Sequence, residues 1–292
     1  NKKISFKFNG KKYFGYEGDT LASALLANGV HLVGRSFKYH RPRGFFGAGV
    51  EEPNAKLQVE FNGHSEPNVN ATEMELVEGL SATSQNCWPS VDFDIGAINN
   101  FLKMFFPAGF YYKTFMWPKS FWYKIYEPFI RKAAGLGVAS IEKDKERYEH
   151  KFEYCDLLVT GSGPSGLASA YAAAKNGAKV ILAEDKPRFG GTLLTDDVSI
   201  DNLSGKDWAE KIITELKSMP NVTVKNRSQV FGYYDHNMLV MFERVSDHLE
   251  KKSKFTPRQR LWYIRAKETI LSTGSIERPI VFGNNDTPGI FL

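Results

Sequence analysis

Cysteine is almost absent from this chain of 292 residues, which contains only Cys87 and Cys155. Two cysteines are too few to hold an iron–sulfur cluster, which takes four protein ligands. They are also too far apart along the chain for a CxxC redox pair, and too few for a cysteine-based zinc site. A single disulfide between them is possible, but so few cysteines favour a reducing compartment, and we expect a cytoplasmic protein.

Long apolar runs are missing too. The mean hydropathy is −0.35, and no stretch approaches the ~20 apolar residues of a membrane span. The start, Asn1 to Ser5, has neither an initiator Met nor the apolar core of a secretory signal, which suggests a trimmed chain. The net charge of +5 is diffuse, so it suits an anionic cofactor or an acidic partner and requires no nucleic acid.

Catalytic motifs are equally scarce. The sequence has no nucleophile elbow, no HExxH and no close carboxylate pair in a supporting context. We therefore predict no catalytic residue and no metal ligand in this chain. The carboxylate and histidine of Asp235-His236-Asn237 resemble an acid–base pair, but Asp and Asn favour a turn there.

Residues 1–80 are predicted to form a small α+β domain of the β-grasp kind. Ile4–Phe8 and Lys12–Tyr16 alternate around Asn9-Gly10, a strong hairpin signal. Asp19 is expected to cap a helix that ends at Gly29. Lys56–Phe61 alternates cleanly, and Thr72–Val77 offers a last strand.

Residues 81–150 are predicted to be an aromatic connector of short helical pieces, because three prolines interrupt them. Fourteen aromatic rings lie between Phe93 and Phe129, which suits either a local core or an interface. The charged residues 142–151 are expected to be a solvated boundary. His40, in a basic and aromatic loop, suits either a flavin phosphate or partner contact or simple solvation.

Residues 151–292 have the β-α-β pattern of a dinucleotide-binding domain. The sequence Gly161-Ser162-Gly163-Pro164-Ser165-Gly166 fits GxGxxG between a buried strand and an Ala-rich helix. Gly161 permits the turn, Gly163 admits the pyrophosphate, and Gly166 allows close helix–strand packing. The backbone N–H of Ser165 is expected to face the phosphates at the positive end of the helix dipole.

Glu184 closes the next strand, 23 residues after Gly161, where a carboxylate binds ribose hydroxyls and disfavours a 2′-phosphate. The sequence therefore favours NAD or FAD over NADP, although Lys186 weakens the case against NADP. Asp185 and Lys186 follow at the lip of the adenosine site. Thr192 follows Gly190-Gly191, a glycine pair common in flavoproteins with two dinucleotide domains.

Two further positions complete the predicted nucleotide site. Val230 follows a strand whose successor residue usually offers its backbone to the adenine, and Gly274 ends the Thr-Gly strand near the cofactor. The fold class is thus α/β, with a partial Rossmann-like FAD/NAD(P)-binding domain. The chain ends soon after that Thr-Gly strand, so we expect this domain to be incomplete at its carboxyl end.

Several unusual strings resemble the amino-terminal part of the heterotetrameric sarcosine oxidase alpha subunit. They are Arg35–Gly44, Gly47–Asn54, Phe106–Pro118, Tyr234–Asn237, Ile276–Pro279 and Asn285–Asp286. The alpha subunits of amine and imino-acid dehydrogenases, including proline dehydrogenase, and of hydrogen cyanide synthase share these modules.

The resemblance implies a ferredoxin-like β-grasp domain without cluster ligands and an NAD site whose nucleotide does not turn over. It implies beta, gamma and delta subunits as partners, FAD in the beta subunit, FMN at the alpha–beta interface and tetrahydrofolate in a further carboxy-terminal domain. The complex would demethylate sarcosine to glycine, with oxygen as the electron acceptor. By position, the implied NAD contacts are Ser165, Glu184, Asp185, Lys186, Thr192 and Val230.

Two other functions fit parts of the sequence. A self-contained NADH:flavin oxidoreductase of the disulfide-reductase superfamily would need a second GxGxxG, and none follows Gly166. A pure interaction protein with a vestigial nucleotide fold would not depend on Glu184 for nucleotide affinity.

Overall fold

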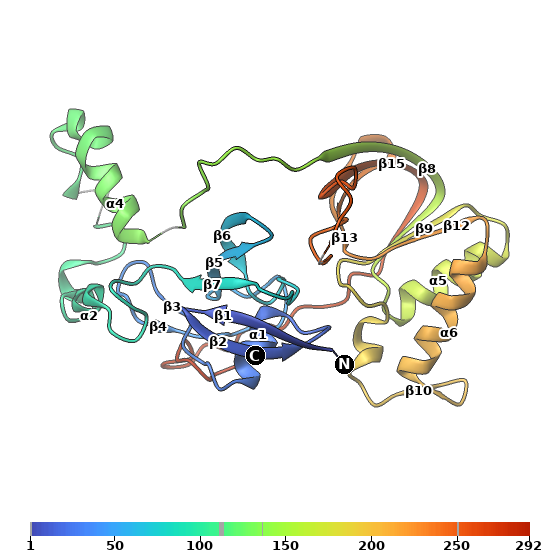
Figure 1. Cartoon of the computed structure of the whole chain (residues 1–292), viewed down its shortest axis with the longest axis horizontal. Coiled ribbons are helices and arrows are strands. Elements are labelled where there is room, and N and C mark those ends of the chain that lie inside the picture. Colours follow the sequence, from blue (N-terminus) through green and yellow to red (C-terminus); the bar gives the residue numbers. More distant parts are fainter. Residues whose placement is uncertain (1, 111–113, 136, 250) are drawn as a thin grey trace. The chain divides into compact units, whose positions relative to one another are not determined.

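The computed structural model describes residues 2–110, 114–135, 137–249 and 251–292. The chain divides into two compact units, Asn1–Lys143 with Ile276–Leu292, and Asp144–Ser275. They are called here the first and the second unit (Figure 1). The finer division at residues 80 and 150 stays a prediction.

The first unit is built on a five-stranded sheet of order β2-β1-β7-β5-β6 with one helix, α1. Its elements are β1 (Lys3–Phe8), β2 (Lys11–Tyr16), α1 (Leu21–Ala27), β5 (Lys56–Phe61), β6 (His64–Asn70) and β7 (Ser81–Ser84), with a small ribbon of β3 (Gly34–Arg35) and β4 (Pro42–Arg43). The β1–β2 and β5–β6 pairs are antiparallel hairpins, and β7 joins them by pairing parallel to β1 and antiparallel to β5. The predicted hairpin, helix and returning strands of an α+β module are thus present.

Alternation of apolar and polar residues produces the core of this sheet. In β1 and in β5 every second side chain is buried, and α1 covers them with Leu21 and Leu25. Burying such a side chain contributes roughly 1.5–3 kcal/mol. The turn at Asn9 and Gly10 has positive φ at both residues, the geometry for which Asn-Gly is suited.

Two local predictions in this unit are wrong. The helix begins one residue later than expected, because Thr20 rather than Asp19 is the N-cap and shares a reciprocal capping box with Ser23. Thr72–Val77 is not a strand, since the carbonyl of Asn70 accepts the N–H groups of both Glu73 and Met74 and so closes a turn there.

The described parts of the aromatic segment, residues 95–110 and 114–134, contain short helical pieces as predicted. They are η1 (Ile95–Ala97), α2 (Ile98–Phe101), η2 (Lys103–Phe105), η3 (Lys119–Phe121), η4 (Trp122–Tyr126) and α4 (Glu127–Ala134). None of these pieces has a buried residue among those described. In the described part of the chain, no helix is both long and apolar enough for a bilayer crossing.

The second unit has a six-stranded sheet of order β12-β9-β8-β15-β14-β13. Its elements are β8 (Tyr148–Thr160), α5 (Pro164–Lys175), β9 (Val180–Ala183), η5 (Gly191–Leu194), β10 (Ser199–Ile200), β11 (Leu203–Ser204), α6 (Gly205–Ser218), β12 (Val222–Lys225), β13 (Ser228–Tyr234), η6 (Asp235–Asn237), β14 (Met238–Arg244) and β15 (Gln259–Leu271). Strands β12, β9, β8 and β15 are parallel, and β13 and β14 continue the sheet antiparallel.

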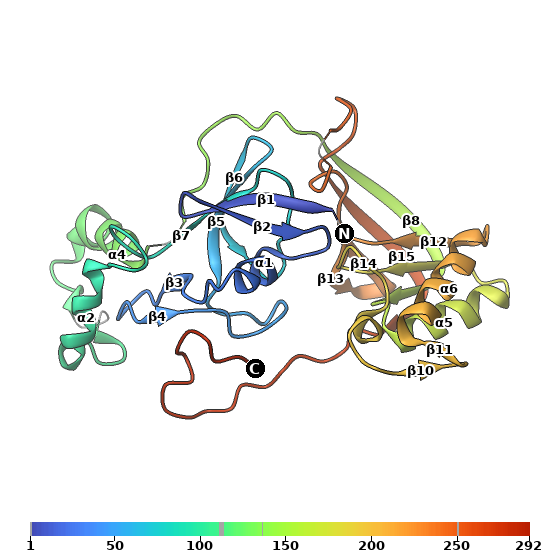
Figure 2. The ribbon, with the colours of Figure 1, turned by 60° about the horizontal axis from the view of Figure 1, so that its bottom comes forward.

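The helices of this unit lie together along the parallel strands (Figure 2). Leu167 of α5 and Leu216 of α6 are fully buried in one core cluster with Val159 of β8. A second cluster, which includes Leu158 and Met241, joins the parallel strands to β14. Because β8, β9 and β15 are parallel, their carboxyl ends meet at one edge of the sheet.

Strand β8 begins earlier than predicted. It starts at Tyr148, inside the charged boundary, because it pairs with β15 from Tyr148–Gln259 as far as Thr160–Leu271. The ring of Tyr263 on β15 stacks on Phe152 with centroids 5.0 Å apart. This pairing extends the strand even though its first residues are largely exposed.

Candidate functional site

The turn after β8 depends on two glycines. Gly161 has φ +94°, and a Cβ there would lie 2.2 Å from the carbonyl oxygen of Ser272. A Cβ at Gly166, in the first turn of α5, would lie 2.0 Å from the carbonyl oxygen of Gly161. Both positions exclude any side chain, so the turn and the close approach of α5 to β8 require glycine.

Gly163 differs from these two glycines. It is the N-cap of α5, and nothing lies within 4 Å of where its Cβ would be. A Cβ at Gly191, which has φ +53°, would lie 3.0 Å from the Cα of Gly163, so the Gly190-Gly191 turn adjoins the first turn. Open space therefore lies directly in front of the Gly163 backbone.

The amino end of α5 carries no internal cap. Among the described residues, its N-cap, Gly163, makes no side-chain cap hydrogen bond, and its first turn has no acidic residue. Ser165 is exposed there, and Pro164, at the first helical position, has no N–H to satisfy. The free N–H groups and the helix dipole of this 12-residue helix favour an anion at this point.

Glu184 lies directly after β9 with its carboxylate buried against the glycine turn. Its Oε2 accepts the backbone N–H of Ser162 at 2.9 Å and the Ser162 hydroxyl at 2.5 Å, and its Oε1 accepts the N–H of Lys186 at 3.0 Å. Burial raises the pKa of Glu184 to about 7, and the neighbouring Asp185 carboxyl adds to the rise. The hydrogen bonds from Ser162 and Lys186 act in the opposite direction.

Ser162 is a site residue that the sequence reasoning missed. Besides its two bonds to Glu184, its hydroxyl accepts the N–H of Gly190 at 3.1 Å. It therefore connects the glycine turn, the acidic residue and the Gly190-Gly191 turn. The GxGxxG pattern allows any residue type at this position. The only sequence signal for a role of Ser162 was therefore its small, hydroxyl-bearing side chain.

The remaining predicted residues lie around the same edge of the sheet. Asp185 is half-buried, and its carbonyl accepts Arg244 at 2.8 Å. The N–H of Ser228 donates to the carbonyl of Glu184 at 2.7 Å, which places the start of β13, and Val230 two residues on, near the acidic residue. Val230 itself pairs with Met241.

Thr192 and Gly274 are both exposed. Thr192 lies in η5, directly after the Gly190-Gly191 turn. Gly274, with φ +71°, follows the end of β15, where Ser272 donates to the carbonyl of Thr160 at 2.8 Å. All the predicted positions thus belong to the carboxyl edge of the parallel strands or to the segments that adjoin it.

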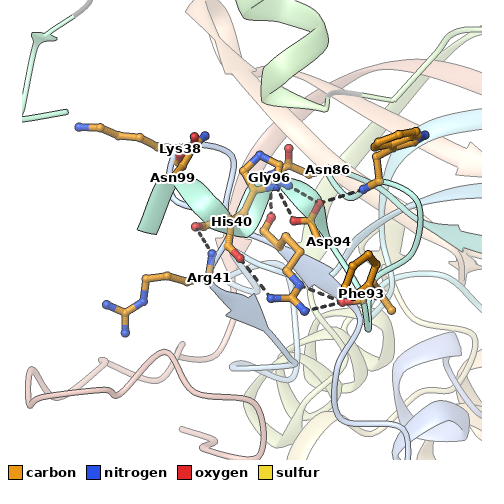
Figure 3. A network of polar contacts seen from close by, with 12 residues as sticks. Lys38, His40, Arg41, Asn86, Phe93, Asp94, Gly96 and Asn99 are labelled. Atoms are coloured by element: carbon orange, nitrogen blue, oxygen red, sulfur yellow. Dashed lines mark hydrogen bonds and ion pairs between the residues drawn. The ribbon is translucent and has the colours of Figure 1, made fainter. Parts of the chain in front are cut away.

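Two histidines outside this edge have structural roles. The Nδ1 of His40 lies 2.5 Å from Oδ2 of Asp94, whose other oxygen accepts the N–H groups of Trp88 and Gly96 (Figure 3). His40 is buried, which rules out the solvated-loop alternative. His236 lies in η6 with φ +60°, so the predicted turn is confirmed.

The two thiols have raised pKa values. Burial raises the pKa of Cys155 to about 11 and also raises that of Cys87. Within the described residues no group of three or more His, Cys, Asp or Glu side chains is placed to hold a metal ion.

Two protein-family models match parts of the chain, one within each unit. Residues 1–87 match a "2Fe-2S iron-sulfur cluster binding domain", and residues 156–241 match an "FAD dependent oxidoreductase" domain. The crystal structure of L-proline dehydrogenase from P. horikoshii superimposes with a TM-score of 0.59 at 21% identity. The match covers 99% of this chain and 44% of that one, which shows a shared fold.

Curated relatives extend the match to the whole chain. The sarcosine oxidase alpha subunit of Rhizobium meliloti (strain 1021) is 54% identical over all 292 residues, which are 30% of its own length. That of Corynebacterium sp. (strain U-96) is 34% identical over 99% of this chain and 26% of its own length. A component of opine oxidase from Agrobacterium tumefaciens (strain Ach5) is 27% identical over 47% of this chain and 27% of its own. The chain belongs to the family of sarcosine oxidase alpha subunits and spans about three tenths of the length of these curated relatives.

Proposed function

We propose that the second unit binds NAD through its adenosine diphosphate half at the carboxyl edge of β8, β9 and β15. The open space before Gly163, beside the uncapped amino end of α5, is the observation that carries this proposal. The residues present fit such a group. Glycine removes the Cβ where a pyrophosphate would approach, and the free N–H groups of α5 supply donors for it.

Glu184 supplies the ribose contact in this proposal. A carboxylate has about four acceptor positions, and three are taken by the N–H and hydroxyl of Ser162 and the N–H of Lys186. The Asp185 carboxyl contacts the remaining position in the free protein, and one ribose hydroxyl replaces it there when the nucleotide binds. Lys186 and Asp185 flank the ribose, Val230 offers backbone to the adenine, and Ser165, Thr192 and Gly274 lie along the rest of the nucleotide.

FAD is the second candidate for this site, because residues 156–241 match a flavin-dependent family. FAD and NAD share the adenosine diphosphate half, so the residues above hold either. The two differ in the remaining half, toward which Thr192 and Gly274 would face.

Calorimetric titration of the purified protein with NAD, FAD and NADP tests the proposal. We expect NAD to bind and NADP to bind more weakly. At about pH 8, Glu184→Ala should weaken NAD binding by about 100-fold, because it removes a charge-assisted hydrogen bond worth up to about 3 kcal/mol. Glu268→Ala, at an exposed position on β15, is the matched control. Tight binding of FAD without measurable binding of NAD would contradict the proposal of an NAD site. If Glu184→Ala bound nucleotide as tightly as the wild-type protein, a vestigial nucleotide fold would be favoured.

At the level of the complex, we propose a sarcosine-oxidase-like activity: oxidative demethylation of sarcosine to glycine, with oxygen as acceptor and tetrahydrofolate receiving the one-carbon unit. The relatives' names support it. The flavins supply the redox chemistry at the alpha–beta interface and in the beta subunit, while this chain holds nucleotide and docks partners. Oxygen uptake by the complex with sarcosine, compared with opines and proline, tests the substrate.

The aromatic segment is the surface that we propose for the partner subunit. Phe101, Met104 and Trp117 are 84–87% exposed. The segment is nevertheless held in place, since the Tyr39 hydroxyl donates to the carbonyl of Phe106 at 2.7 Å. Residues 95–134 contain six Lys or Arg and one acidic residue, Glu127. An apolar partner surface with an acidic rim complements this face, whereas a second copy of it would repel.

Removing two of these anchors is expected to weaken assembly about tenfold or more, the size of effect of an interface hot spot. The variant is Phe101→Ser with Trp117→Ser, and its dissociation constant for the co-expressed subunits is measured by light scattering. Phe255→Ser, in a 74% exposed position of the second unit, is the control. Equal dissociation constants of the two variants would contradict the proposal that this segment is the partner interface.

A further inference from the structure

The loop from Phe46 to Ala55, which leads into β5, is organised around one buried carboxylate. Glu52 is 2% exposed. Its Oε2 accepts the backbone N–H groups of Phe46 and Gly47 at 2.5 and 2.7 Å. Its Oε1 accepts those of Asn54 and Ala55 at 2.6 and 3.1 Å. Four amides from both ends of the loop therefore converge on a single side chain.

A second carboxylate completes the arrangement. Glu51 accepts the N–H groups of Ala48 and Gly49, each at 2.9 Å. The Thr72 hydroxyl donates to the carbonyl of Gly49 at 2.6 Å, which holds the loop from the other side. Six backbone amides of one short loop thus point at two anionic groups.

The family match of residues 1–87 implies an iron–sulfur cluster, and the residues do not fit one. A [2Fe–2S] cluster is held by four Cys thiolates, or by two Cys and two His. Residues 1–87 contain a single cysteine, Cys87, which lies outside the loop. No candidate metal-binding group occurs in the described part of the chain. Loops that bind clusters or phosphates direct backbone N–H groups at the anion, as this loop does.

We infer that Glu52, supported by Glu51, is the internal anion that takes the place of an iron–sulfur cluster in this domain. The carboxylates satisfy the converging N–H groups that a cluster's sulfur atoms would otherwise accept. Without an anion at that point, the four N–H groups that Glu52 accepts, which are buried or partly buried, would lose their partner, and this opposes the loop's conformation. In this inference the loop of residues 46–55 has a structural role, and the domain does not transfer electrons.

The test is amide hydrogen exchange of the alpha subunit within its complex, read on peptides that cover residues 46–55. Glu52→Gln keeps the side-chain volume but replaces one carboxylate oxygen with an NH₂ group, which cannot accept hydrogen bonds from two of the backbone N–H groups. We therefore expect amide exchange in this loop to be at least about tenfold faster. Exchange in β1 should not change. Glu60→Gln, which removes a charge from an exposed position of β5, is the matched control. Equal exchange in the two variants would overturn the inference.

Two further measurements separate an anion site from simple packing. In the Glu52→Ala variant, added formate should restore slow amide exchange in the loop, because formate is a small carboxylate that can replace the missing one. Sodium chloride at the same ionic strength should not restore it. Equal effects of the two salts would contradict an anion requirement. The wild-type protein incubated with iron and sulfide should show no visible absorption band of a cluster. Appearance of that band would overturn the inference even where a Glu52 variant does not fold.

Discussion

Replacing Gly163 with alanine is expected to weaken nucleotide binding by about 100-fold but to lower the unfolding temperature only slightly, because alanine is a poorer N-cap than glycine. The added methyl group meets nothing within 4 Å in the protein itself. It would instead occupy the space through which the pyrophosphate approaches the amino end of α5. Loss of one or two charge-assisted hydrogen bonds, each worth about 1.5–3 kcal/mol, gives this magnitude. Titration calorimetry and thermal unfolding measure the two quantities on the same sample.

Gly166→Ala provides the contrast. Its Cβ would lie 2.0 Å from the carbonyl oxygen of Gly161, so the variant should lose stability whether or not a nucleotide binds. Gly283→Ala is the neutral control, because Gly283 has ordinary φ and open space around its Cβ. A Gly163→Ala protein that binds nucleotide as tightly as Gly283→Ala would place the pyrophosphate elsewhere.

Local patterns in the sequence predicted those features that depend on near neighbours. The alternation in β1 and β5, the Asn9-Gly10 turn and the glycines of the fingerprint each act over a few residues. Thr72–Val77 has the composition of a strand, but the preceding Asn70 carbonyl closes a turn that propensity alone does not reveal. Tertiary pairing likewise extends β8 into a charged stretch that looked like a linker.

Contacts between distant residues and backbone atoms could not be predicted in this way. Asp94 pairs with His40 from 54 residues away. Within the described residues, Glu52 accepts hydrogen bonds from backbone N–H groups, and such partners leave no trace in residue types. Ser162 occupies a position that the fingerprint leaves open, and its role follows only from the fold that brings Glu184 against it.

Nucleotide affinity is expected to rise with pH through the titration of Glu184. The carboxyl has a pKa of about 7 in the free protein, because burial disfavours its charge. A ribose hydroxyl that donates to Oε1 favours the ionised form and lowers the pKa toward the ordinary value of 4.5. Protonated Glu184 must then release its proton on binding. Affinity should rise roughly 30-fold between about pH 5.5 and pH 8 and level off above about pH 8.

The same shift has the opposite effect on the stability of the free protein. Since the folded-state pKa lies above the unfolded value, the stabilising contribution is complete below about pH 4.5 and is lost as the pH rises through about 7. The free energy of unfolding should fall by about 3 kcal/mol across that range from this group alone. Urea unfolding at about pH 5 and about pH 8, with and without NAD, measures it.

Glu184→Gln decides whether this one carboxyl is responsible. The amide has nearly the same size and keeps an oxygen for the Ser162 donors, but it cannot titrate. Its nucleotide affinity should be low and independent of pH, and its calorimetric heats should not vary with the ionisation enthalpy of the buffer. In the wild-type protein at about pH 6 those heats should report the release of close to one proton. A Glu184→Gln protein with the wild-type pH profile would assign the titration to another group and remove the ribose contact from this site.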